Sequence, residues 1–94
     1  MAAPMTIAQQ IVAMYESTGL VPCAAVVRSG RLACIEAVVK EATGKTLMEH
    51  FGMNESMAGG VVGGFCRRAL QRRHTEAYRG GHAIGLAVAE AVGL

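Results

Sequence analysis

The N-terminal segment has the hydrophobic pattern of an amphipathic helix. Apolar residues recur three and four positions apart from Ile7 to Tyr15, with polar residues between them. Thr6 and Gln9 have the spacing of a capping box, in which each side chain bonds to the other residue's backbone amide. Gly19 suits the left-handed position after a helix end. The pattern predicts a helix over about residues 6–17.

The segment after this helix allows two interpretations, of which the first is a hairpin. Val26-Val27 and Leu32-Ala33 would pair as strands about a Ser29-Gly30 turn. Ser-Gly is a weaker two-residue turn than Asn-Gly. This register would also place Arg28 opposite Arg31, at a cost of about 0.2–1 kcal/mol. The sequence leaves open whether residues 23–34 form a hairpin.

The second interpretation is a helix over about residues 31–43, and we favour it. Apolar positions recur there at spacings of three and four. Glu36 precedes Lys40 by four residues, which is the favourable order for a helical ion pair, and Gly44 follows as a stop. Residues 20–29 would then be extended or irregular.

Three further helices follow from capping signals. Thr46 and Glu49 form a second capping box and predict a short helix over about 47–51. Asn54 is a good N-cap for a helix that continues to about Arg73. Thr75 caps a last helix over about 76–92. We therefore predict one all-α domain over residues 1–94, a small orthogonal bundle of four main helices and one short helix, with a short extended segment at residues 20–29.

The last two helices contain glycines at a spacing of four residues. Four helical glycines in one segment cost about 1 kcal/mol each relative to alanine, so close backbone packing must offset this loss. Their spacing does not match a phosphate-binding loop. The predicted helix-packing residues are Gly59, Gly60, Gly63, Gly64, Gly81 and Gly85.

The composition is apolar for a small domain. Hydrophobic residues make up 52% of the chain and charged residues 17%, against roughly 25% charged residues in an average domain. This excludes an intrinsically disordered chain. The last helix is apolar on two sides, with Ile84, Ala87, Val88 and Ala91 on the face turned away from the glycines. We therefore expect a homo-oligomer, with a two-fold dimer favoured.

The chain carries no membrane signal. No apolar run reaches the length of about 18 residues that a membrane helix needs, and the N-terminal ten residues lack the basic and apolar regions of a signal peptide. We expect a cytoplasmic protein with no membrane partner.

The positive charge is concentrated in one stretch. Residues 1–60 hold four basic and five acidic residues, a balance of −1, whereas residues 61–94 hold five arginines and two glutamates, a balance of +3. The arginines are Arg67, Arg68, Arg72, Arg73 and Arg79. They could contact phosphates, so nucleic-acid association through this surface is the alternative function.

Candidate chemistry is sparse. The cysteine and histidine spacings match no metal-binding or C-x-x-C motif, so we predict no metal and no cofactor. Cys34 would lie in the first turn of a helix, three residues after Arg31, where the thiol pKa would fall. A thiol-based redox function through Cys34 is therefore the third hypothesis.

No catalytic constellation is visible in the sequence, because the glutamates are spread singly among the helices. We therefore expect a non-enzymatic protein-protein interaction or oligomerisation module.

Overall fold

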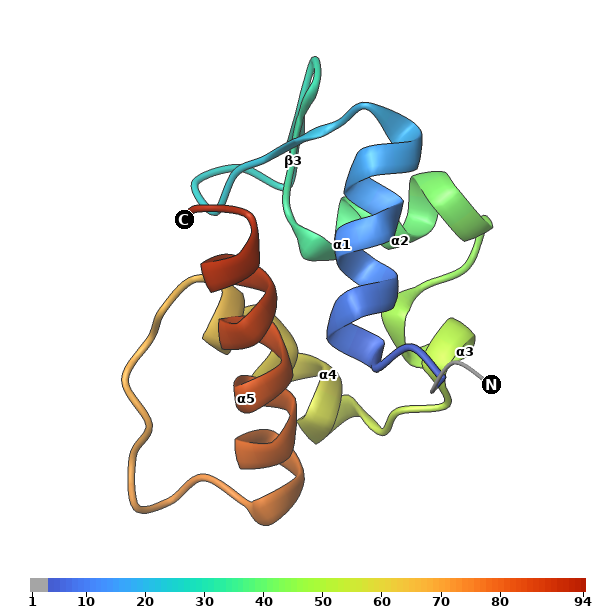
Figure 1. Ribbon diagram of the computed structural model, residues 1–94. Coiled ribbons are helices and arrows are strands. Elements are labelled where there is room, and N and C mark those ends of the chain that lie inside the picture. The colour runs from blue at the N-terminus through green and yellow to red at the C-terminus, as the bar shows by residue number, and fades with distance from the viewer. Residues whose placement is uncertain (1–3) are drawn as a thin grey trace.

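The structure is a computed structural model that describes residues 4–94, so the first three residues of the predicted domain lie outside the described residues. Within that range the chain forms five helices and one small sheet (Figure 1). In chain order the elements are α1 (Ile7–Thr18), β1 (Val21–Pro22), β2 (Arg28–Ser29), β3 (Leu32–Ala33), α2 (Ile35–Thr43), α3 (Leu47–Phe51), α4 (Glu55–Phe65) and α5 (Glu76–Ala91).

The helix caps predicted from the sequence are present in the structure. The boxes at Thr6 and Thr46 are both closed by reciprocal hydrogen bonds. The side chain of Asn54 caps α4 and that of Thr75 caps α5. Helices α1, α3 and α5 therefore begin and end within one residue of their predicted bounds.

The prediction of an all-α fold is wrong, because residues 21–33 form a three-stranded mixed sheet. The strand order is β1-β3-β2. Strand β1 pairs in parallel with the central strand β3, and β2 pairs with β3 in the antiparallel direction. The predicted extended segment at residues 20–29 therefore belongs to a sheet. Residues predicted as the start of the second helix form the central strand β3, so that helix begins at Ile35 instead of residue 31.

The observed register of the hairpin avoids the repulsion between Arg28 and Arg31 that the sequence suggested. Arg28 pairs with Ala33, so Gly30 and Arg31 form the two-residue turn and the two arginines are not opposite each other. Gly30 has a φ of 57° at the first turn position, where a type II′ turn requires glycine. The guanidinium of Arg31 donates to the carbonyl of Gly19 at 2.9 Å.

Helix α4 is shorter than predicted and ends at Phe65 rather than near Arg73. Arg67 adopts a φ of 56° and donates its amide to Gly64, while the next amide, of Arg68, donates to Gly63. This pair of bonds is a Schellman stop. The sequence gives no sign of it, because an arginine occupies the left-handed position that glycine usually fills.

Helices α4 and α5 form the largest contact between two elements, and their backbones touch. A Cβ atom on Gly60 would overlap the carbonyl of Tyr78, and one on Gly81 would overlap the carbonyl of Met57. The same holds for Gly64 and Gly85. The glycine hydrogens point at these carbonyls instead, as in weak Cα–H···O bonds. A Cβ atom on Gly59 would make only an ordinary contact with the ring of Tyr78, at 3.9 Å, whereas one on Gly63 would overlap the Tyr78 hydroxyl.

The two helices run in the same direction. The N-terminal ends meet where the hydroxyls of Ser56 and Thr75 lie 2.7 Å apart, and the C-terminal ends meet where Arg67 Nε donates to the carbonyl of Leu94 at 2.9 Å. Residues 66–75 must therefore return along the full length of α4, about 16 Å for its 11 residues. Figure 1 shows this loop outside the helix pair.

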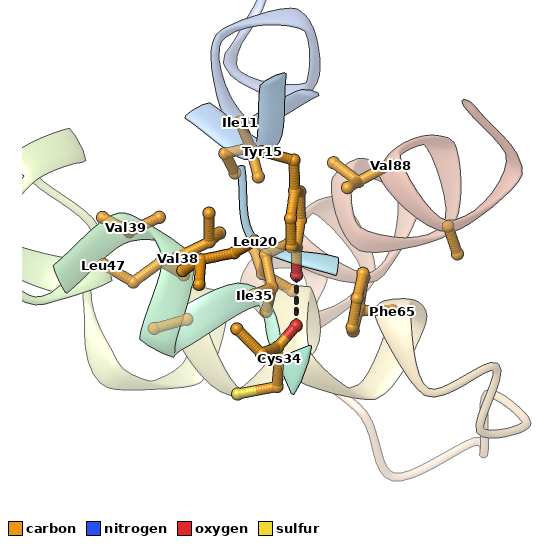
Figure 2. Packing of buried hydrophobic residues seen from close by; sticks show 14 of the residues in the cluster. Ile11, Tyr15, Leu20, Cys34, Ile35, Val38, Val39, Leu47, Phe65 and Val88 are labelled. Atoms are coloured by element: carbon orange, nitrogen blue, oxygen red, sulfur yellow. Dashed lines mark hydrogen bonds between the residues drawn. The ribbon is translucent and has the colours of Figure 1, made fainter. Parts of the chain in front are cut away.

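The core lies where α1, α2, α4 and α5 meet. Fully buried side chains from all four helices fill it, and Figure 2 shows Val88 and Phe65 near Tyr15. Helix α1 packs on α5, and Val88 is completely buried. One predicted member of the second apolar face of α5 is thus covered within the chain itself.

Tyr15 links the core to the sheet. Its ring stacks on Phe65 at a centroid distance of 6.3 Å, and its hydroxyl donates to the carbonyl of Ala33 at 2.8 Å (Figure 2). Burial raises the pKa of this hydroxyl well above its ordinary value, and the nearby Cys34 and Cys23 add to the rise. The tyrosine therefore stays protonated and holds β3 against α1.

Adjacent glycines provide a matched test of the helix contact. Gly60→Ala and Gly81→Ala should each lower the free energy of unfolding by about 1–3 kcal/mol, because the new methyl group overlaps backbone atoms. Gly59→Ala and Gly80→Ala meet no close neighbour and should raise it by up to about 1 kcal/mol. Urea unfolding of the four variants measures this. Equal effects within either neighbouring pair would contradict the close-contact account.

Tyr15→Phe should lower the free energy of unfolding by about 0.5–1.5 kcal/mol. The loss is modest because the Ala33 carbonyl keeps the amide of Cys23 as a partner at 3.1 Å. The raised pKa means that the folded state holds the proton more tightly than the unfolded chain. Wild-type stability should therefore fall as the pH rises above about 10, the unfolded pKa.

Chemical unfolding across alkaline pH measures this dependence, with Tyr78→Phe as the control because its hydroxyl takes no part in the Tyr15 bond. Tyr15→Phe should flatten the tyrosine-linked part of the decline and Tyr78→Phe should not. An identical pH dependence in wild type and Tyr15→Phe would refute the assignment.

Candidate protein-interaction site

An apolar depression on the surface forms a groove beside α2. It has a volume of about 520 Å³ and runs between the approach to β2, the outer side of α2 and the start of α3. Leu47 is buried at its base. Val27 is 67% exposed and Met48 is 40% exposed, so two large apolar side chains of the groove face solvent. The full lining consists of Val27, Arg28, Glu36, Ala37, Lys40, Glu41, Thr46, Leu47 and Met48.

The charges in the groove lining balance. Two are acidic, Glu36 and Glu41, and two are basic, Arg28 and Lys40. Arg28 and Glu41 form an ion pair of 3.5 Å in which both side chains are about half exposed. Such a surface pair contributes little stability, so its partners are free to exchange for charges on another molecule.

A second groove lies between α1 and α5. Its volume is about 430 Å³, and Ala87 and Ala91 of α5 line one side of it. These alanines belong to the face of α5 that the sequence assigned to a dimer, whereas Val88 of the same face is buried. On the α5 side this groove offers only alanines, and its large exposed apolar side chain is Met5, which precedes α1.

The five arginines share one region but not one helix face. Arg67, Arg68, Arg72 and Arg73 lie in the loop between α4 and α5, and Arg79 lies in α5. Residues 66–73 were predicted to continue the helix, but α4 ends at Phe65, so Arg68 and Arg72 do not share a helix face. All five residues are exposed.

The histidine beside these arginines is held in a neutral form. The ring of His74 stacks on Tyr78 at a centroid distance of 4.0 Å. Desolvation lowers the pKa of His74, and the positive charges of Arg73 and Arg79 lower it further. Its Nδ1 accepts the amide of Gln71 at 2.9 Å, which requires an unprotonated nitrogen.

The three cysteines lie at or near the small sheet. Cys34 is the N-cap of α2, one residue before the helix begins, and not part of its first turn as predicted; it is 7% exposed. Cys23 donates its amide to Ala33, the residue before Cys34, and the sulfur of Cys66 lies 3.9 Å from the carbonyl of Ala24. All three thiols are free. Arg31, expected to favour the Cys34 thiolate, bonds instead to the chain at Gly19.

Residues 4–94 contain no cluster of histidine, cysteine or acidic side chains that could hold a metal ion. In the same range every fully buried side-chain nitrogen or oxygen has a hydrogen-bond partner. None of the helices described is both long enough and apolar enough to cross a bilayer.

Sequence reasoning missed the groove because its parts are distant in the chain. Val27 and Met48 are 21 residues apart. They line the same groove only because the sheet and the turn between α2 and α3 bring them together. One signal was present: Met48 follows Leu47 in a short capped helix, and one face of such a helix cannot bury two adjacent apolar residues.

Comparison with known proteins adds no family assignment: no protein-family model, no curated protein and no solved structure matches the chain.

Proposed function

We propose that this protein is a protein-protein interaction module whose groove beside α2 binds a second copy of the chain. The observation that carries the proposal is the apolar groove with Val27 and Met48 exposed in it. Exposed apolar surface of this kind, rimmed by polar residues, marks binding sites in soluble proteins. The groove beside α1 is a weaker candidate, because its α5 side offers only alanines.

The balanced charges favour a second copy as the occupant. In a two-fold contact each surface meets itself, so an acidic residue of one subunit can face a basic residue of the other. The rim supplies this complementarity through Glu36 and Glu41 with Arg28 and Lys40. The arginine-rich loop on α4 and α5 could not form such a contact, because it would bring like charges together.

The dimer should be weak. Burying Val27 and Met48 of both subunits would contribute about 1–2 kcal/mol per side chain, since each is already partly covered. Their sum is about 4–8 kcal/mol, whereas association costs about 4–15 kcal/mol before any other gain. Contacts of the rim and of Ala37 must supply the remainder. We therefore expect assembly in the micromolar range or above.

We also propose that the protein works in the cytoplasm. The support is the state of its cysteines: the structure has three thiols and none of them is paired. Whether cysteines form disulfides depends on the redox conditions of the compartment. Free thiols are the usual state of cysteines in a reducing compartment.

Met48→Glu should abolish self-association, because it places a charge in the apolar groove. The fold should survive, since residue 48 lies in the exposed first turn of α3, where an acidic side chain is favourable. Leu70→Glu is the matched control, because Leu70 is 41% exposed and lies outside the groove. Sedimentation equilibrium measures the average mass against the 9.8 kDa monomer.

The expected result is a mass that rises with concentration for wild type and Leu70→Glu but stays at the monomer value for Met48→Glu. A wild type that is monomeric at high micromolar concentration would overturn the proposal. So would an equal loss of association in both variants, since that would assign the contact to another surface.

A further inference from the structure

The loop between α4 and α5 concentrates cations on one side of the molecule. Residues 66–75 hold four arginines and no carboxylate, and Arg79 adds a fifth guanidinium from the first turns of α5. Glu76 is the one acidic residue between Glu55 and Glu90. The stretch from residue 66 to residue 79 therefore carries a net charge of about +4 at neutral pH.

No acidic side chain of the described chain forms an ion pair with these arginines. Within residues 4–94 the one ion pair joins Arg28 to Glu41, which lie at the sheet and α2. The guanidinium groups of Arg68 and Arg72 make no hydrogen bond inside the described chain either, and both residues are exposed. These two residues are therefore free to bind an external anion.

The loop backbone is already held in one arrangement. Arg79 donates to the carbonyl of Gln71 at 2.8 Å and to that of His74 at 3.3 Å. The amide of His74 also donates to Gln71, at 3.1 Å. At the other end, His82 Nε2 lies 2.6 Å from the carbonyl of Arg68. A ligand would therefore meet a largely preorganised surface and would not have to order the loop on binding.

We propose that this loop binds the phosphate backbone of double-stranded nucleic acid without reading its sequence. Each free guanidinium presents five donors in a planar fork that matches a phosphate. Arg68 and Arg72 are four residues apart, so their Cα atoms are at most about 14 Å apart. A duplex carries one negative charge per roughly 1.7 Å of its axis, so both side chains reach phosphates of one backbone segment.

A duplex fits this surface better than a single strand or a membrane. Binding of single strands relies on exposed aromatic rings between the cations, and the one ring in the loop, His74, is already stacked on Tyr78. Membrane binding needs apolar insertion besides charge. Leu70 is the one large apolar side chain exposed in residues 66–75, and a single leucine is a weak anchor.

The salt dependence gives the expected size of the effect. If three or four arginines neutralise phosphates, the logarithm of the binding constant should fall with the logarithm of salt concentration at a slope of about −3 to −4. Between about 50 mM and about 200 mM salt the affinity should drop about 10²-fold. Binding should be the same for unrelated duplex sequences.

The test uses the double variant Arg68→Gln and Arg72→Gln in the full chain. Neither side chain bonds within the described structure, so the fold should be kept, and circular dichroism checks it. The matched control is Lys40→Gln with Lys45→Gln, which removes the same charge from α2 and the turn after it, on the other side of the molecule (Figure 1). Fluorescence anisotropy with a short labelled DNA duplex measures affinity across a salt series.

The proposal predicts that the arginine variant loses about two units of the salt slope while the lysine variant keeps the wild-type slope. It is overturned if wild type does not bind the duplex at low salt, or if both variants weaken binding equally, which would indicate a net-charge effect. It is also overturned if vesicles of anionic phospholipid bind more tightly than the duplex at equal phosphate concentration. The wild-type slope tests the proposal even if a variant does not fold.

Discussion

The direct backbone contact between α4 and α5 is the constraint on which the rest of this structure depends. Four glycines leave no side chain between the two helices, so each meets a carbonyl of the other helix. Such a contact tolerates neither sliding nor rotation, because any shift would bring a larger residue into the seam. Helices α1 and α2 complete the core against the surface that this pair presents.

The parallel direction of this pair explains why the intervening loop is long and exposed. A chain that leaves the end of α4 must travel back along the helix before α5 can begin beside its start. The Schellman stop at Arg67 begins this return and the cap at Thr75 ends it. Since α4 and α5 already cover each other, the returning segment lies on the outside (Figure 1), where arginines are well solvated and remain available.

The molecule consequently presents two surfaces of different chemistry. The groove beside α2 is apolar with a balanced rim, and the loop beyond α4 is cationic, with no acidic side chain of residues 4–94 paired to it. Apolar surface gains free energy when any complementary surface covers it, whereas a cationic surface gains it mainly from anions and repels its own copy. The two proposed roles can therefore coexist, because they use separate parts of the chain and respond differently to salt.

The sequence by itself determined the helix termini, because a cap is a local interaction between residues three apart, as at Thr6, Thr46 and Thr75. It also indicated that the glycines pack closely, since nothing local offsets their cost in a helix. The sequence left open whether Leu32–Ala33 is a strand, and the tertiary structure decided it, because β1 and β2 pair with the two sides of this segment. Only the tertiary structure decided the end of α4, where Arg67 takes a left-handed conformation and its side chain reaches Leu94. The groove was likewise invisible in the sequence, because it exists only after separate segments have been brought together by folding.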